Sequence, residues 1–71
     1  MIKYINISNF DTVENRVLSH PDIPYETNDF VYWLDYCGEC AALKRKAKDN
    51  SSGHTKGKVE KVAYYNKEDL E

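Results

Sequence analysis

The feature that most constrains the fold is a pair of cysteines separated by two residues, Cys37-Gly38-Glu39-Cys40, directly after the apolar and aromatic run 30–36. Aromatic and β-branched residues in that run favour a strand, and Gly38 would cost a continuous helix about 1 kcal/mol. Two structures then remain open for the next segment. Gly38-Glu39 is either the two-residue turn of a hairpin or the start of a helix over 40–48, which is rich in Ala, Leu and Lys.

Apolar residues at helical spacing predict an amphipathic helix over 10–19. Ser8 or Asn9 is suited to cap its first turn, and Pro21 ends it because a proline disfavours helical backbone at the residue before it. Ahead of this helix, an isoleucine-rich alternation predicts a strand over 2–8.

Two segments are predicted after the cysteines and the segment that follows them, a polar loop and then one more strand. Residues 49–58 are polar and basic and contain two glycines, which predicts a flexible loop, and the alternation over 58–65 predicts a strand. The polarity of the tail 66–71 favours fraying. The sequence therefore predicts a single α+β domain over 1–71. Its expected order is β-α-β, then a helix or hairpin strand, then β.

The length of 71 residues limits what such a domain can do. A chain this short buries only about 60% of the surface that its unfolded form exposes, so it presents a surface more readily than a complete catalytic site. Association with a second copy or with a partner would bury more of it. With no long apolar run and no signal-peptide pattern, we expect a cytoplasmic protein of a bacterial host, without a membrane partner and with its cysteines as thiols.

The residues around the cysteines resemble the N-terminal half of thioredoxin. The likeness lies in Ser8-Asn9-Phe10-Asp11 and in Phe30-Val31-Tyr32-Trp33-Leu34-Asp35-Tyr36-Cys37-Gly38-Glu39-Cys40. In that family a helix is followed by an apolar strand, a Trp-Cys-Gly-Pro-Cys motif and a long helix. The resemblance implies that Cys37 is an exposed nucleophile and Cys40 a buried resolving thiol.

The chain also departs from thioredoxin. Val31 stands at the family's buried acid, Tyr36 at the tryptophan before the first cysteine, and Glu39 at the proline between the cysteines. A carboxylate at Glu39 should raise the pKa of a neighbouring thiol and oppose its activation. The family's cis-proline strand and C-terminal hairpin and helix have no counterpart. A truncated dithiol redox protein is therefore the alternative hypothesis, and the sequence leans against an enzyme.

Two other chemistries rank lower. Cys37 and Cys40 form half of a zinc-binding pattern, but His20 and His54 do not complete it at the usual spacing, so we expect neither a metal nor another cofactor. The basic segment Lys44–Lys58 is suited to phosphates. Because the acidic body of the molecule would repel nucleic acid, direct nucleic-acid binding ranks third.

The charge is distributed unevenly. Residues 1–43 contain two basic and seven acidic residues, for a net charge of −5, whereas residues 44–71 contain eight basic and five acidic residues, for +3. Carboxylates on a rigid surface, with tyrosines between them, can imitate DNA phosphates and occupy the basic cleft of a nucleic-acid-binding protein. In size and acidity the chain resembles small acidic phage early proteins, including inhibitors of the histone-like HU protein.

The leading prediction is therefore a small non-enzymatic interaction protein of phage or mobile-element type. It would bind and inhibit a basic host protein through an acidic, tyrosine-bearing face. The predicted binding residues are Asp11, Glu14, Asp22, Tyr25, Glu26, Asp29, Tyr32, Asp35, Tyr36 and Glu39.

Overall fold

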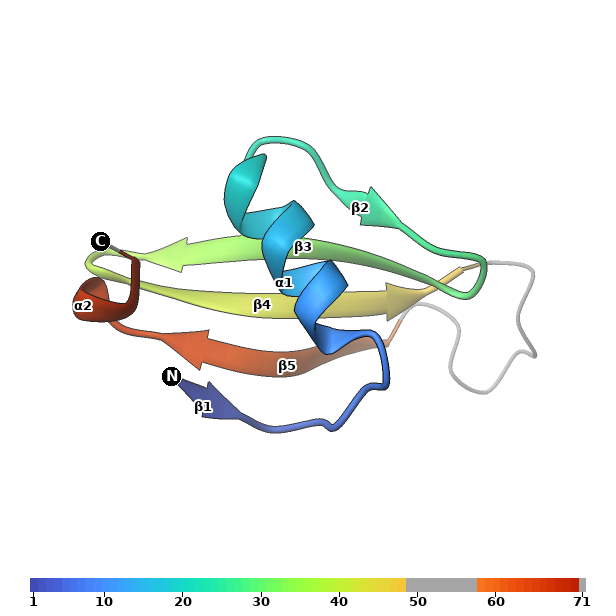
Figure 1. Cartoon of the computed structure of the whole chain (residues 1–71), viewed down its shortest axis with the longest axis horizontal. Coiled ribbons are helices and arrows are strands. Elements are labelled where there is room, and N and C mark those ends of the chain that lie inside the picture. Colours follow the sequence, from blue (N-terminus) through green and yellow to red (C-terminus); the bar gives the residue numbers. More distant parts are fainter. Residues whose placement is uncertain (49–57, 71) are drawn as a thin grey trace.

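The computed structural model describes residues 1–48 and 58–70, which form a five-stranded sheet and two helices. The strands follow the order β1-β5-β4-β3-β2, and each neighbouring pair is antiparallel (Figure 1). The elements are β1 (Ile2–Lys3), α1 (Phe10–Ser19), β2 (Tyr25–Glu26), β3 (Phe30–Cys37), β4 (Cys40–Ala47), β5 (Val59–Tyr65) and α2 (Lys67–Leu70).

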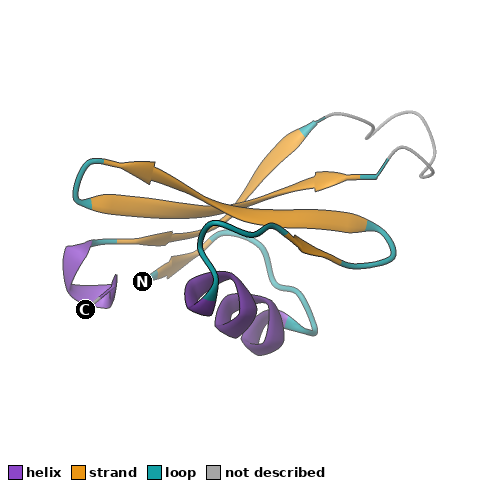
Figure 2. Ribbon diagram, turned by 90° about the horizontal axis from the view of Figure 1, so that it is seen from above, coloured by secondary structure: helices purple, strands orange, loops and turns teal. Residues whose placement is uncertain are grey.

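Helix α1 lies across one face of the sheet, and no described helix covers the opposite face (Figure 2). We call the side that carries α1 the packed face and the other side the open face. The helix buries Phe10, Val13 and Val17, which recur at the spacing that places them on one side of a helix. The sheet contributes the rest of the core: Tyr32, Leu34, Ala41, Leu43, Val62, Ala63 and Tyr65.

Strand alternation assigns the other side chains to the two faces. β3 and β4 pair residue by residue from Phe30 opposite Ala47 to Cys37 opposite Cys40. Directly opposed residues share a face, and neighbours along a strand point to opposite faces. The rung that contains Leu34 and Leu43 therefore belongs to the packed face. The next rung, with Trp33 opposite Lys44, belongs to the open face.

A β-bulge changes this alternation in β5. Leu43 pairs with Ala63, but the next residue of β4, Lys44, pairs with Lys61, so β5 contains one additional residue, Val62. A bulge lets two consecutive residues of one strand oppose a single residue of its partner. Val62 and Ala63 are both 0% exposed, and both belong to the core.

The segment after the first cysteine is a hairpin strand and not a helix. Gly38 has φ +77°, and no described non-glycine residue has a positive φ, so only the first residue of the two-residue turn is left-handed. This is the pattern of a type II′ turn, whose twist matches that of the flanking strands. Pairing along the whole length of β3 outweighs the helix propensity of 40–48. The strand predicted at 30–36 is confirmed, with Cys37 added.

The first strand is much shorter than predicted. The sequence predicts a strand over 2–8, but β1 contains only Ile2 and Lys3. The backbone N–H groups of Tyr4 and Ile5 both donate to the carbonyl oxygen of Val62, at 2.8 and 3.3 Å, and the regular ladder ends there. Ile5 and Ile7 still pack against the core from irregular backbone.

The other predicted elements agree in part. The helix over 10–19 is confirmed, although Asn9 at its N-cap makes no side-chain capping hydrogen bond. The loop expected after it contains the short strand β2, and the last predicted strand is Val59–Tyr65. The expected order therefore lacks β2 and α2. The loop predicted at 49–58 lies outside the described residues, except for Lys58.

The described residues contain no helix that is long and apolar enough to cross a membrane.

Candidate functional site

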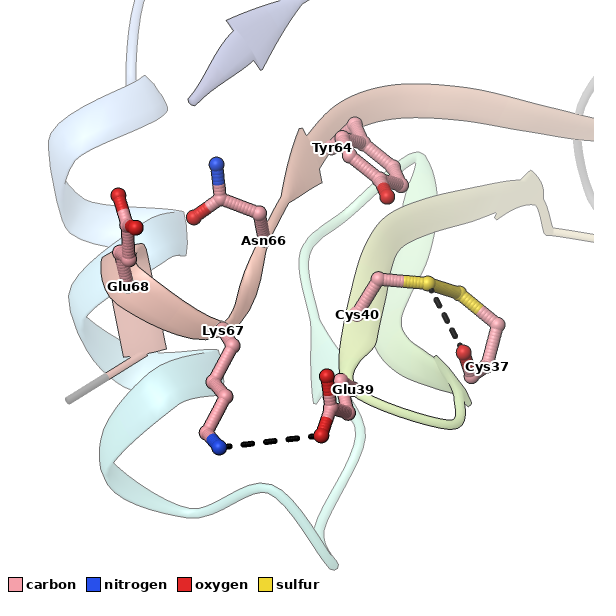
Figure 3. A pocket seen from close by; sticks show the side chains of 7 residues that line it. All are labelled: Cys37, Glu39, Cys40, Tyr64, Asn66, Lys67 and Glu68. Carbon is pink, nitrogen blue, oxygen red and sulfur yellow. Dashed lines mark hydrogen bonds and ion pairs between the residues drawn. A yellow bond between two sulfur atoms is a disulfide. The ribbon is translucent and has the colours of Figure 1, made fainter.

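The strongest candidate site is the end of the β3–β4 hairpin. Cys37 and Cys40 occupy the last rung before the turn, with their Cα atoms 5.2 Å apart, and a disulfide joins their sulfur atoms (Figure 3). This differs from the sequence-based expectation of two thiols. The difference arises because the hairpin register places the two side chains directly opposite each other on the same face. Cys37 is exposed and Cys40 is partly buried.

An open pocket of about 480 Å³ lies beside this disulfide. Side chains from β5 and α2 form its other wall, so the pocket joins three segments of the chain (Figure 3). The residues that line it are Cys37, Glu39, Cys40, Tyr64, Asn66, Lys67 and Glu68.

Helix α2 positions the charged groups of this pocket. The Asn66 side chain accepts a hydrogen bond from the Asp69 backbone N–H, and the Asp69 carboxylate accepts one from the Asn66 backbone N–H, both at 3.1 Å. This reciprocal pair is a capping box, which satisfies two N–H groups at the start of the helix. The N-terminal ammonium of Met1 also contacts Asp69 at 3.0 Å, and its hydrogen bond lowers the pKa of that carboxyl group.

Glu39 in the hairpin turn forms an ion pair with Lys67, and its Oε1 atom lies 3.7 Å from the lysine Nζ. Both side chains are largely exposed, so the pair contributes little to stability. Its chemical effect is local. The Lys67 ammonium offsets the Glu39 carboxylate, which by itself would disfavour a thiolate at the neighbouring cysteines.

The structure does not gather the predicted acidic face into one surface. Asp11 and Glu14 lie on α1, on the packed side, whereas Glu26 and Asp35 lie on rungs of the open face. The remaining carboxylates belong to separate turns and loops. They are Asp22 between α1 and β2, Asp29 before β3, and Glu39 at the hairpin turn.

Several of these carboxylates already have partners within the molecule. Asp35 pairs with Lys44, Glu26 pairs with Lys48, and Glu14 accepts a hydrogen bond from the Tyr65 hydroxyl at 2.8 Å. The protein therefore neutralises part of the charge that the mimicry hypothesis requires.

The three predicted tyrosines also have different environments. Tyr32 is only 3% exposed and belongs to the core, so its side chain is not available to a binding surface. Tyr25 is half-buried, with its ring stacked on that of Tyr32 at 6.4 Å between centroids. Tyr36 is 56% exposed. Asp35, Tyr36 and Glu39 all lie near the hairpin end, but Asp35 belongs to the open face and Tyr36 to the packed face, so they do not form one surface.

The zinc interpretation receives no support from the described residues. They contain no group of three or more His, Cys, Asp or Glu side chains arranged to hold a metal ion. Cys37 and Cys40 are bonded to each other, and His20 lies at the C-terminal end of α1. His54 lies outside the described residues.

Four residues of the pocket were missed by the sequence reasoning: Tyr64, Asn66, Lys67 and Glu68. A signal for the last three is present in Asn66-Lys67-Glu68-Asp69. A capping residue followed three positions later by an acid marks the start of a helix. Tyr64 had no such signal, because only the sheet order places it beside the hairpin.

Neither a known protein family, a curated protein nor a solved structure matches this chain.

Proposed function

We propose that this protein takes part in thiol–disulfide exchange through the Cys37–Cys40 hairpin. The observation that carries the proposal is an exposed disulfide at the outermost rung of a hairpin, next to an open pocket. An attacking thiol needs access to one sulfur along the disulfide axis and a route for the other sulfur to leave. Exposure of Cys37 supports the first requirement, and the partly buried Cys40 is then the leaving group.

The disulfide is not needed to define the fold, which favours a chemical role. It closes a loop of only four residues, for which the chain-entropy model gives about 2 kcal/mol of stabilisation. The backbone ladder continues from Tyr36 opposite Ala41 to Phe30 opposite Ala47, and the turn between the strands is already favourable. Opening the bond should therefore leave the sheet intact.

The reaction requires a low-molecular-weight thiol as reductant. Its thiolate attacks Sγ of Cys37, a new sulfur–sulfur bond forms, and the electron pair of the broken bond goes to Sγ of Cys40, which takes up a proton from water. A second thiolate attacks the reagent's sulfur in this mixed disulfide and releases the Cys37 thiolate. In total, two reagent thiols are oxidised to one disulfide, and the protein disulfide is reduced to two thiols.

Lys67 is the residue expected to favour an anionic thiol. Its ammonium group lines the pocket on the side opposite the disulfide. Among the residues that line the pocket, Lys67 is the one cation against two carboxylates, Glu39 and Glu68. Its ammonium therefore reduces the repulsion that an anionic thiol meets there.

The test is an equilibration of the purified protein in glutathione buffers of increasing reducing strength. Thiols are then alkylated and counted by mass spectrometry, while circular dichroism follows the fold. We expect reversible reduction of the folded protein. The Cys40→Ser variant should accumulate glutathione on Cys37. Reduction only after the sheet has been unfolded would make the bond structural and would overturn the proposal.

A matched pair of variants tests the role of Lys67. Lys67→Glu should slow reduction by glutathione more than reduction by uncharged 2-mercaptoethanol. Lys61→Glu changes the net charge equally but lies outside the pocket. Equal slowing by both variants would assign the effect to overall charge.

The acidic-face interaction remains a prediction. Its predicted residues lie on both faces of the sheet, and Asp35 and Glu39 each have a lysine partner within the molecule.

A further inference from the structure

The open face of the sheet carries a second arrangement, which shares only Tyr64 with the pocket beside the disulfide. Three aromatic side chains and three lysines share this face in the region between β1 and β3. Lys44 lies opposite Trp33 on one side and opposite Lys61 on the other, and Tyr64 lies on the adjoining rung. The six residues are Tyr4, Trp33, Lys44, Lys46, Lys61 and Tyr64.

We infer that the open face binds single-stranded nucleic acid. Bases would stack on Trp33 and Tyr64, and Lys44, Lys46 and Lys61 would contact the phosphates. Proteins that bind single strands without base-specific contacts combine a positively charged surface along the backbone with aromatic side chains on which bases stack. Both components occur here on one sheet face.

The charge of this face differs in sign from that of the whole chain. The chain carries a net charge of −2. The described rungs of the open face carry Lys44, Lys46 and Lys61 against Asp35, which pairs with Lys44. A further carboxylate, Glu26, lies at the β2 edge in an ion pair with Lys48 at 3.3 Å. Glu39 and Glu68 line the pocket beside Tyr64, so the excess of positive charge lies at Lys46 and Lys61, farther from the hairpin turn, and an anionic chain can approach there.

The aromatic side chains are accessible and separated from one another. Trp33 and Tyr64 are partly exposed, and Tyr4 is 52% exposed. From the strand spacing and the rise per residue, the Cα atoms of Trp33 and Tyr64 lie about 12 Å apart, so they would stack on separate bases. The Lys61 ammonium lies 5.6 Å from the centre of the Tyr4 ring, which places a positive charge at a third aromatic group.

Other occupants fit this face less well. In a two-fold dimer the same patch meets itself, so two surfaces that each carry three lysines against Asp35 would be brought together. An acidic peptide would satisfy the charges but would offer no flat bases to Trp33 and Tyr64. A single strand satisfies both.

The test uses the fact that Trp33 is the only tryptophan in the chain. A dT oligonucleotide of about ten nucleotides, within the usual site sizes of single-strand-binding folds, is titrated into the oxidised wild-type protein. We expect quenching of Trp33 fluorescence and a matching rise in the anisotropy of a labelled oligonucleotide. For three phosphate contacts on a single strand, affinity should fall about twentyfold between 50 and 200 mM salt.

Matched variants separate this face from overall charge. Lys46→Glu and Lys61→Glu should each weaken binding about fivefold or more, whereas Arg16→Glu on α1, with the same change in net charge, should change it less than about twofold. Tyr64→Ala should weaken binding about fivefold or more with a smaller change in salt dependence, because stacking is lost and phosphate contacts remain. All variants are first shown to be folded by circular dichroism.

Five results would overturn the inference. Four of them are an absence of binding at low salt, equal loss in Arg16→Glu, equal affinity for duplex DNA, and quenching of Trp33 that depends on protein concentration alone. The last would assign the face to contacts between copies of the chain. Preferential binding of a poly-glutamate peptide would assign it to an acidic protein partner.

Discussion

The two faces of the sheet use the same strands for different purposes. On the packed face, small and apolar side chains such as Leu43 and Ala63 are almost fully buried beneath α1. On the open face, Trp33, Lys44 and Tyr64 remain partly exposed. Because neighbours along a strand point to opposite faces, adjacent residues are under different constraints. Side-chain shape and volume limit which residues can replace Leu43, whereas Lys44 is distinguished by its charge and by its aromatic neighbour on the open face.

The largest expected effect is on the packed face. Leu43→Ala should lower the free energy of unfolding by about 3 kcal/mol, because Leu43 is 1% exposed and its truncation leaves a cavity in a small core. Lys46→Ala on the open face should change it by less than about 0.5 kcal/mol. Urea unfolding followed by circular dichroism measures both. Similar losses in the two variants would contradict the division between faces.

A smaller effect is expected where α1 is held to the sheet. The Tyr65 hydroxyl donates a hydrogen bond to the Glu14 carboxylate at 2.8 Å, and Tyr65 is 2% exposed. Tyr65→Phe should lower the free energy of unfolding by about 1–2 kcal/mol, since it removes a hydrogen bond to a charged acceptor. Tyr36→Phe is the matched control, because Tyr36 is largely exposed.

The same hydroxyl should make stability depend on alkaline pH. Burial, followed by the hydrogen bond and the charge of Glu14, raises the pKa of Tyr65 well above its ordinary value of 10.0. The unfolded chain loses this proton near pH 10 while the folded protein keeps it, so stability falls as the pH rises above about 10. The fall should be steeper in wild type than in Tyr65→Phe. Equal slopes would show that Tyr65 ionises normally in the folded protein.

The smallest effect compares one ion pair on each face. Arg45 on the packed face pairs with Glu60 at 3.0 Å, has a side chain only 14% exposed, and stacks over the Phe30 ring at 4.0 Å. On the open face, Asp35 pairs with Lys44 but is 53% exposed. Glu60→Gln should lower the free energy of unfolding by up to about 1 kcal/mol, and Asp35→Asn by less than about 0.5 kcal/mol. A larger loss in Asp35→Asn under the same urea conditions would reverse the comparison.

The spacing of apolar residues within a short segment was enough to predict some of the helices and strands. Phe10, Val13 and Val17 are enough to indicate α1, and the aromatic run ending at Tyr36 indicates β3. Local pattern did not decide between helix and hairpin after Gly38, because Ala, Leu and Lys favour a helix in isolation. The deciding interactions are cross-strand pairs, which depend on residues distant in sequence.

The candidate site was predictable at its cysteines and not around them. The Cys-x-x-Cys spacing identified Cys37 and Cys40, but their disulfide follows from the hairpin register. Tyr64 and Lys67 reach the site only because β5 pairs with β4. The bulge at Val62 was also hidden, because a strict alternation over 58–65 would place Val62 and Ala63 on opposite faces.

The strand order also determines the order in which the strands pair during folding. β3 and β4 are joined by a two-residue turn, whereas β1 pairs with β5 through Ile2 opposite Tyr64, near the other end of the chain. Closing that longer loop costs more chain entropy, and only two residues of β1 contribute pairs in return. The hairpin is therefore the natural starting point of folding, and the β1–β5 edge is the last part of the sheet to form and the first to open.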